Sequence, residues 1–139
     1  MKVVTRQIQL NTKPDLDIID ITCHVSDAVK GSKLRSGTVT IFVPGSTGSV
    51  STMEYEPGLL KDIPRALEQF APSGIDYAHH RTWGDDNGKS HVRATIMGPS
   101  LTVPFVDGKL TLGTWQQIVF LDFDTPSRSR NLIVQIMGE

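Results

Sequence analysis

The stretch Gly37-Thr38-Val39-Thr40-Ile41-Phe42-Val43 carries the clearest structural signal in the chain. Apolar and β-branched residues alternate in it with a period of two, and successive side chains of a strand point to opposite faces. Val39, Ile41 and Val43 would therefore share one face, while the threonines and Phe42 take the other. The stretch predicts a strand that is buried on at least one face.

Similar runs occur along the whole chain, separated by Gly, Pro, Asn or Asp. They cover Val4–Leu10, Val50–Tyr55, Val92–Met97, Leu101–Val106, Gln117–Phe123 and Leu132–Met137. Asp107-Gly108, between Leu101–Val106 and Lys109–Leu112, is a typical two-residue hairpin turn. The pattern predicts a sheet-rich domain of short strands.

Two segments have helical rather than strand spacing. The first carries apolar residues from Ile21 to Val29 and has Gly31 as a left-handed stop; Cys23 falls on it, and we expect that side chain to serve packing. In the second, Leu60, Ile63, Leu67 and Phe70 follow helical spacing, and Pro64 leaves two alternatives. Either a short turn at Leu59–Lys61 precedes a helix that starts near Asp62, or one longer helix is kinked.

Helices that interrupt hairpin-connected strands favour an α+β domain with a mostly antiparallel sheet and two to three helices over a doubly wound parallel fold. The length of 139 residues fits a single domain over residues 1–139. A lone cysteine excludes a disulfide framework and a zinc site built mainly from cysteines. A net charge of -1 argues against a nucleic-acid partner. Since no apolar run approaches about 20 residues and no secretory signal is evident, we expect a cytoplasmic protein without a membrane partner.

The loop after the first quoted strand concentrates glycines and hydroxyl groups. It reads Pro44-Gly45-Ser46-Thr47-Gly48-Ser49. Such a loop can expose backbone N–H groups and hydroxyls to an anion, although it lacks the Gly-Lys-Ser/Thr ending of a Walker A loop. We therefore treat Gly45, Ser46, Thr47, Gly48 and Ser49 as candidate substrate-binding residues; the alternative is a flexible turn between two strands.

Three histidines, His79, His80 and His91, lie within thirteen residues. Histidine is a common metal ligand and proton carrier near neutral pH. A turn at 85–88 would fold His80 toward His91, and Glu54 or a nearby aspartate would complete a mixed nitrogen and oxygen site for Zn or Mg. The spacing lacks a His-Glu-x-x-His pattern, so the alternative is surface or hydrogen-bonded structural histidines.

Other candidate substrate-binding residues are scattered along the second half of the chain. Trp115 offers a flat apolar wall and Gln116 a polar anchor, although tryptophan is more often a core residue. Arg128 and Arg130, two positions apart, could clamp a phosphate, with Arg93 as a further cation. Exposed charges in a turn are the ordinary alternative for the arginine pair.

Four segments together resemble the YjbQ-like family, also called the secondary thiamine-phosphate synthase enzyme family. They are Phe-Val-Pro (42–44), Ser-His-Val-Arg-Ala (90–94), Met-Gly-Pro-Ser-Leu-Thr-Val-Pro (97–104) and Gly-Thr-Trp-Gln (113–116). The similarity runs from about Gly37 to Glu139. It implies a compact α+β fold with an antiparallel sheet, assembled as a homotrimer with a polar pocket near the subunit boundaries.

The resemblance also implies a weak thiamine-phosphate synthase activity, known for some members, that joins a pyrimidine pyrophosphate to a thiazole phosphate. The chain departs from the family pattern at two places. Many members carry His-Thr-Ser or His-Thr-Thr where this chain has Gly45-Ser46-Thr47, and Asn-Glu where it has Tyr55-Glu56. The matching candidates that remain are His80 and His91, with a glutamate, Glu54 or Glu56, nearby.

Two functions are compatible with these residues. In the first, the chain is a transferase on a small phosphorylated substrate, with the anion on the glycine and hydroxyl loop, His80 or His91 as proton carrier or ligand to a divalent ion, and Trp115 stacked on a ring. In the second, the same pocket belongs to a non-catalytic metal- or metabolite-binding trimeric module.

Overall fold

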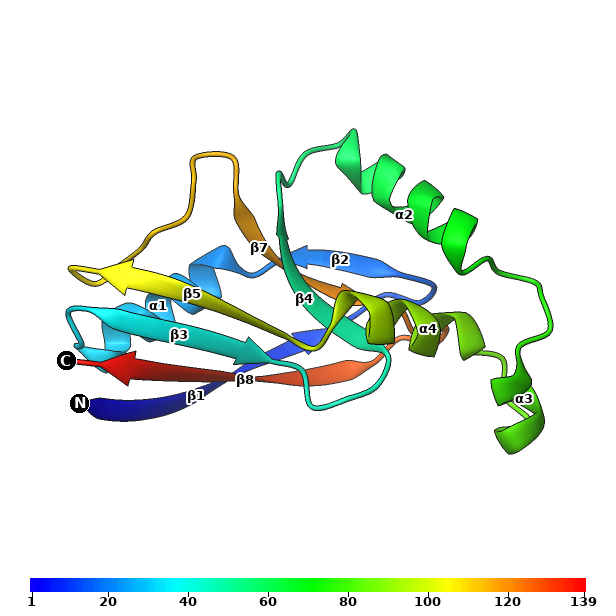
Figure 1. The fold of residues 1–139 in the computed structure, drawn as a ribbon, viewed down its shortest axis with the longest axis horizontal. Helices are drawn as coiled ribbons and strands as arrows, with labels where there is room; N and C mark the ends of the chain where they lie inside the picture. Colours follow the sequence, from blue (N-terminus) through cyan, green and yellow to red (C-terminus); the bar gives the residue numbers. More distant parts are fainter.

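Two antiparallel sheets share one core in the computed structural model, which describes residues 1–139 (Figure 1). One sheet has five strands in the order β1-β8-β3-β5-β6, and the other has three in the order β2-β7-β4. The strands are β1 (Lys2–Asn11), β2 (Asp17–Asp20), β3 (Gly37–Phe42), β4 (Gly48–Met53), β5 (Ser100–Val106), β6 (Lys109–Leu110), β7 (Gln117–Asp122) and β8 (Ser129–Gly138). The helices are α1 (Thr22–Ser32), α2 (Leu59–Phe70), α3 (Ala78–Trp83) and α4 (Gly88–Met97). The predicted α+β class with antiparallel pairing is confirmed.

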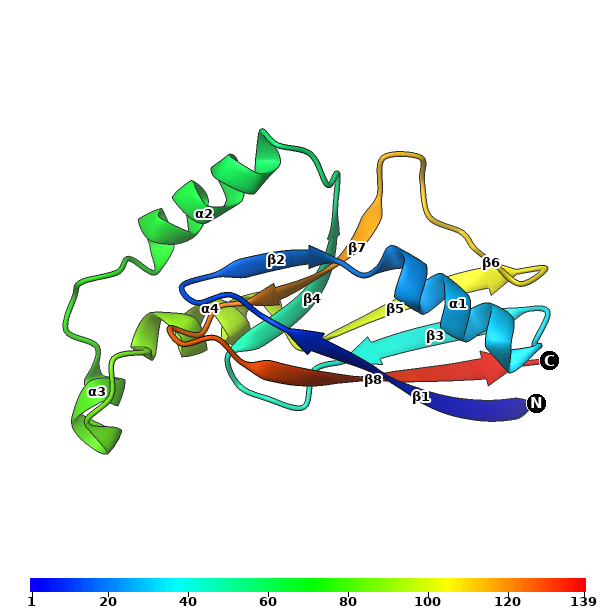
Figure 2. The same ribbon diagram turned by 180° about the vertical axis from the view of Figure 1, so that it is seen from behind.

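The strand with the clearest alternation is β3, at the centre of the five-stranded sheet between β8 and β5. Val39 and Ile41 are fully buried, and Val43, which follows the strand, is buried too. They join α1 in the larger core cluster, and Figure 2 shows α1 lying along this sheet. The predicted strand, with Val39, Ile41 and Val43 on a buried face, is therefore confirmed.

Strand β7 is buried on both faces. Ile118 and Phe120 belong to the larger core cluster, whereas Val119 and Leu121 belong to a smaller cluster that α2 and α4 cover. Burial on both faces explains why this strand is apolar without alternation. The buried strand also fixes the position of the segment that follows β7, where the candidate site begins.

The strand predicted for Val92–Met97 is wrong, because these residues form the second half of α4. The β-branched residues of the stretch suggested a strand. The positions that contact the protein interior are Arg93, Ala94 and Met97, and these follow helical spacing. Packing of this face against β4 and α2 therefore outweighs the intrinsic β preference of the exposed Ile96.

Three smaller features complete the comparison with the sequence. Helix α2 is a single helix with Pro64 inside it, which selects the longer of the two alternatives. Cys23 is exposed on α1, so the expectation that it serves packing is wrong. The chain has four helices where two to three were expected, because the short helix α3 was not anticipated and α4 replaces a predicted strand. No helix of the chain is both long enough and apolar enough to cross a membrane.

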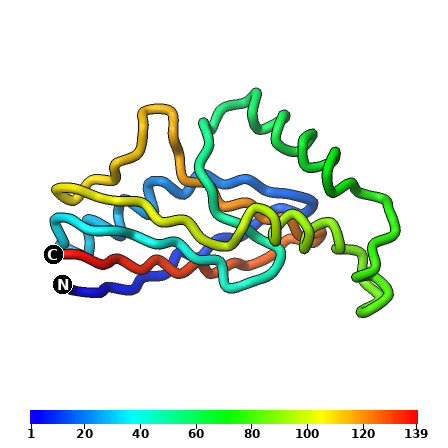
Figure 3. The backbone as a smooth tube through the Cα atoms, viewed as in Figure 1, coloured from blue at the N-terminus to red at the C-terminus, as the bar shows by residue number.

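The two ends of the chain lie side by side at one end of the five-stranded sheet (Figure 3). Lys2 pairs with Gly138, which also pairs with Gly37 on the other side. A Cβ atom added at Gly37 would lie 1.9 Å from the carbonyl oxygen of Met137. The close backbone approach therefore requires glycine at position 37.

We expect Gly37→Ala to lower the free energy of unfolding by roughly 1–3 kcal/mol, since the added methyl group collides with backbone that cannot move alone. Gly31→Ala is the matched control: a Cβ there has no atom within 4 Å, and the helix should gain about 0.5–1 kcal/mol. Urea denaturation of both variants measures the change in the free energy of unfolding, which should be negative for Gly37→Ala and positive for Gly31→Ala. Equal effects would contradict the pairing of β3 with β8.

Candidate functional site

A polar pocket of about 430 Å³ lies where the loop after β3, the start of α4 and the segment after β7 meet. It brings together segments that are far apart in the sequence. Its lining residues are Gly45, Ser46, Thr47, Asn87, His91, Asp124, Arg128, Ser129 and Arg130. Predicted candidates from the loop, the histidine segment and the arginine pair therefore meet in one place.

The pocket is anchored by Asp122, the last residue of β7, whose side chain is 1% exposed. Its two carboxylate oxygens accept hydrogen bonds from Nε and Nη2 of Arg130 at 2.9 and 2.8 Å. The hydroxyl of Thr12, just after β1, donates a third bond at 2.7 Å. These contacts raise the pKa of Arg130, chiefly through the hydrogen bonds to Asp122, and hold its guanidinium in one orientation.

Asp124 is the second buried carboxylate, with 3% of its side chain exposed. It accepts hydrogen bonds from Nδ2 of Asn87 at 3.1 Å and from Nε of Arg128 at 3.0 Å. Burial would raise the pKa of Asp124, but the hydrogen bonds from Asn87, the Thr125 amide and Arg128 outweigh it and lower the pKa. Asp124 is therefore ionised at neutral pH and ties α4 to the segment after β7.

The loop 45–47 is held against this network by Thr47. Its hydroxyl accepts a hydrogen bond from Nη2 of Arg130 at 2.8 Å and donates one to Asp124 at 3.3 Å. The backbone N–H groups of Ser46 and Thr47 make no hydrogen bond to another backbone group. A Cβ added at Gly45 would lie at an ordinary contact distance of 3.4 Å from Nη1 of Arg130, so the loop backbone runs beside the guanidinium. The loop can thus offer amide donors to an anion.

His91 lies on α4 one turn after Asn87, and its ring packs on that of His79 with 4.2 Å between the centroids. Burial and the neighbouring His79 lower its pKa, against a smaller opposite effect of Asp124 and Asp85. The imidazole is therefore neutral at pH 7 and can accept a proton.

Asn87 adds an unusual acceptor to the pocket. Its Nδ2 group donates to Asp124, while its Oδ1 atom is buried and has no hydrogen-bond partner. A buried carbonyl oxygen without a donor is costly, and such atoms in native proteins usually have a partner. Asn87 is therefore a feature of the site and not only a helix-start residue.

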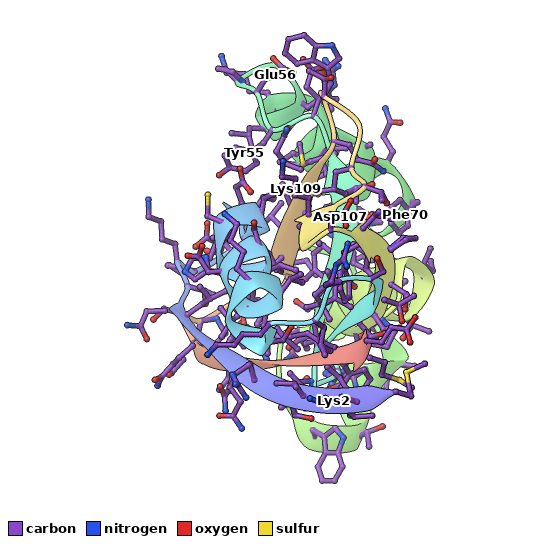
Figure 4. All side chains as sticks on the ribbon, turned by 90° about the vertical axis from the view of Figure 1, so that its left-hand side faces the viewer. Lys2, Tyr55, Glu56, Phe70, Asp107 and Lys109 are labelled. Carbon is purple, nitrogen blue, oxygen red and sulfur yellow. The ribbon has the colours of Figure 1, made fainter.

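The structure does not assemble the predicted metal ligands His80, His91 and Glu54. Nε2 of His80 accepts a hydrogen bond from the Gly88 amide at 3.0 Å, which occupies that nitrogen. Glu54 is exposed beyond the far end of β4, and Figure 4 shows the following residues, Tyr55 and Glu56, near the start of α2. No group of three or more His, Cys, Asp or Glu residues is arranged to hold a metal ion.

The pairing of β4 with β7 gives the physical reason. Gly48 pairs with Asp122 at the pocket, whereas Met53 pairs with Gln117 at the opposite end of both strands. A residue after Met53 is therefore a full strand length away from the histidines.

Several other candidates also lie outside the polar pocket. Arg93 is buried and donates to the carbonyl oxygen of Ala71 and to Glu68, so it joins α4 to α2. Trp115 is 73% exposed in the loop between β6 and β7. Gln116 in the same loop binds the Gly113 amide and the hydroxyl of Thr52.

Two candidates from the glycine and hydroxyl loop belong to β4 instead. Gly48 and Ser49 are both buried, and the Ser49 hydroxyl donates to the carbonyl oxygen of Ala94 at 3.4 Å. Only Gly45, Ser46 and Thr47 of that loop therefore line the polar pocket.

Sequence reasoning missed the residues that organise the pocket, Asp122, Asp124 and Asn87. The available signal was Asp-Phe-Asp (122–124) at the end of an apolar strand, because carboxylates there need partners if the strand is buried. That signal becomes compelling only once β7 is known to be buried on both faces.

Comparisons with known proteins agree with this fold. The family model described as UPF0047 protein YjbQ-like matches residues 6–139. A UPF0047 protein of Archaeoglobus fulgidus is 41% identical over 94% of this chain and 99% of its own length. A UPF0047 protein of Methanothermobacter thermautotrophicus is 38% identical over 100% of this chain and 95% of its own.

Solved structures show the same architecture. The crystal structure of a YbjQ-like protein from Sulfolobus solfataricus superposes with a TM-score of 0.93 at 34% identity, covering 99% of both chains. A YjbQ/UPF0047 protein from Clostridium acetobutylicum gives a TM-score of 0.86 at 34% identity, covering 95% of this chain and 99% of its own. On sequence and fold together, the chain belongs to the YjbQ-like UPF0047 family.

Proposed function

We propose that the polar pocket binds the phosphate group of a small phosphorylated molecule and that His91 exchanges a proton with that ligand. The observation that carries the proposal is the convergence of two fixed arginines with two free loop amides. Arg128 and Arg130 are oriented by buried carboxylates, and Ser46 and Thr47 offer unpaired N–H groups beside them. Such donors bind oxyanions without further rearrangement.

The proposed binding depends on the orientation of the hydrogen-bond donors more than on the net charge of the pocket. Asp122 and Asp124 balance the formal charge of the two arginines, so long-range attraction of an anion is weak. A guanidinium has five N–H donors, and Asp122 and Thr47 occupy only those on Nε and Nη2 of Arg130. Nη1, next to Gly45, remains for a ligand oxygen.

The thiamine-phosphate synthase-type transfer is one reaction that such a pocket would serve. In it, a pyrophosphate group leaves while a pyrimidine is joined to a thiazole phosphate. The arginines and loop amides would hold the leaving oxygens, and neutral His91 would serve as the proton carrier. We also propose that the protein is cytoplasmic. No step of this reaction is assigned to a metal ion, because His80, His91 and Glu54 do not come together as a set of metal ligands.

A non-catalytic binding module, assembled as a homotrimer, is the second candidate. The observation that favours it is the scarcity of free reactive groups in the pocket. Asp124, Arg128 and Arg130 are all engaged with one another or with neighbours, which leaves His91 as the one titratable lining residue without such a partner. A pocket of this kind can hold a metabolite without transforming it.

Titration with inorganic phosphate and pyrophosphate tests the anion site. We expect Arg128→Gln and Arg130→Gln to weaken binding by roughly 10- to 100-fold, because each removes charge-assisted hydrogen bonds. Arg35→Gln is the matched control, since Arg35 forms an exposed ion pair with Asp107 in the turn between β5 and β6, at the opposite end of the fold from α4 (Figure 1). Isothermal calorimetry gives the affinities.

Circular dichroism must accompany the titration, because Arg130→Gln leaves the buried Asp122 without its main partner. Arg128 is 48% exposed, so its variant should fold normally. Unchanged phosphate affinity in folded Arg128→Gln and Arg130→Gln would refute the anion site.

Titration of the histidine rings by NMR tests the state of His91. We expect a midpoint below the ordinary value of 6.5, because burial and the neighbouring His79 disfavour the charged imidazolium. His79→Gln should raise that midpoint by removing the nearby charge. A His91 midpoint above 6.5 would contradict the packed histidine pair.

Turnover separates the two candidate functions. If the chain is a transferase, coupling of the pyrimidine pyrophosphate to the thiazole phosphate should fall by at least about 100-fold in His91→Gln while phosphate binding persists. If wild type binds phosphate without turnover, the binding module is supported. Native mass spectrometry of the same preparation tests the homotrimer. Elemental analysis tests whether a Zn or Mg ion is bound by ligands other than the set His80, His91 and Glu54.

A further inference from the structure

A second cavity of about 310 Å³ adjoins the polar pocket and shares Gly45 and Ser46 with it. Its other lining residues are Gly48, Ala94, Thr95 and Pro99. We call it the neutral compartment, because none of its six lining side chains carries a charge. The polar pocket beside it is lined by two arginines, an aspartate and a histidine.

Helix α4 connects the two cavities. His91 lines the polar pocket, and Thr95, one helical turn further on, lines the neutral compartment. At a rise of about 1.5 Å per residue, these two positions are roughly 6 Å apart along the helix axis. One small molecule can therefore have its charged group in the first cavity and its remaining part in the second.

The walls of the neutral compartment are small and mostly without free polar groups. Ala94 and Gly48 are buried. A Cβ at Gly48 would lie 2.9 Å from the Phe120 ring, so position 48 has no room for a larger side chain. The Thr95 hydroxyl donates to the carbonyl oxygen of His91 at 2.7 Å, which turns it back onto its own helix. The compartment offers contact surface and no ion pair, which suits an uncharged group.

We infer that the ligand is a phosphate ester of a small uncharged organic group, with the phosphate in the polar pocket and the organic group in the neutral compartment. The inference rests on the proposed function and adds the substrate class. Inorganic phosphate alone would leave the neutral compartment without contacts. A cationic organic group would find no carboxylate there to replace its lost hydration.

Three phosphate compounds and one set of variants test this assignment. Wild type should bind phenyl phosphate at least about tenfold more tightly than inorganic phosphate, since ring burial adds favourable free energy. Phosphoethanolamine, whose organic group is cationic, should gain no such advantage. Thr95→Phe should abolish the preference for phenyl phosphate while leaving the affinity for inorganic phosphate unchanged.

Thr82→Phe, at an exposed position of α3 outside both cavities, is the matched control and should keep the preference. Thr95→Leu provides a smaller obstruction if the phenylalanine variant is unstable, and it should reduce the preference in part. Phosphate binding by wild type with no preference for phenyl phosphate overturns this inference alone. Equal weakening of both ligands in the Thr95 variants also overturns it, whereas absence of any phosphate binding by wild type overturns the proposed function as well.

Discussion

The bidentate pair between Asp122 and Arg130 is the interaction on which the candidate site depends. Taking two charges out of water costs several kcal/mol for each ion, and only good geometry with extra hydrogen bonds offsets that cost. Both conditions hold, since both carboxylate oxygens and the hydroxyls of Thr12 and Thr47 take part. The pair joins the end of β7, the start of β8 and the loop before β4, so fold and pocket have a common anchor.

Rigidity of the pocket follows from where that anchor lies. Strand β7 is central in its sheet and buried on both faces, so Asp122 and Asp124 are fixed by the two hydrophobic clusters beside them. Arg128, Thr47 and Asn87 take their positions from these carboxylates. Hydrophobic packing thus fixes the orientation of polar groups that belong to three separate segments, which is the arrangement that a preorganised oxyanion site needs.

The sequence was informative where local spacing decides the outcome. The alternation around Val39 predicted β3, and the helical spacing near Leu67 predicted α2, because each pattern reflects one buried face. Which residues meet across the fold is set by strand pairing, which one sequence does not reveal. His91 and Arg130 reached a common pocket, whereas Glu54 was separated from it because the register of β4 on β7 places it at the opposite end.

The glycine at position 45 ties the two cavities to the same anchor. Its missing side chain leaves the Nη1 group of Arg130 close to the loop backbone, and it is also one of the two residues that both cavities share. A larger side chain there would have to occupy space next to the guanidinium or at the junction of the cavities. Asp122 and Thr47 orient Arg130, and Gly45 adds no side chain at the junction of the cavities beside it, which makes a ligand that spans both cavities the simplest occupant of this site.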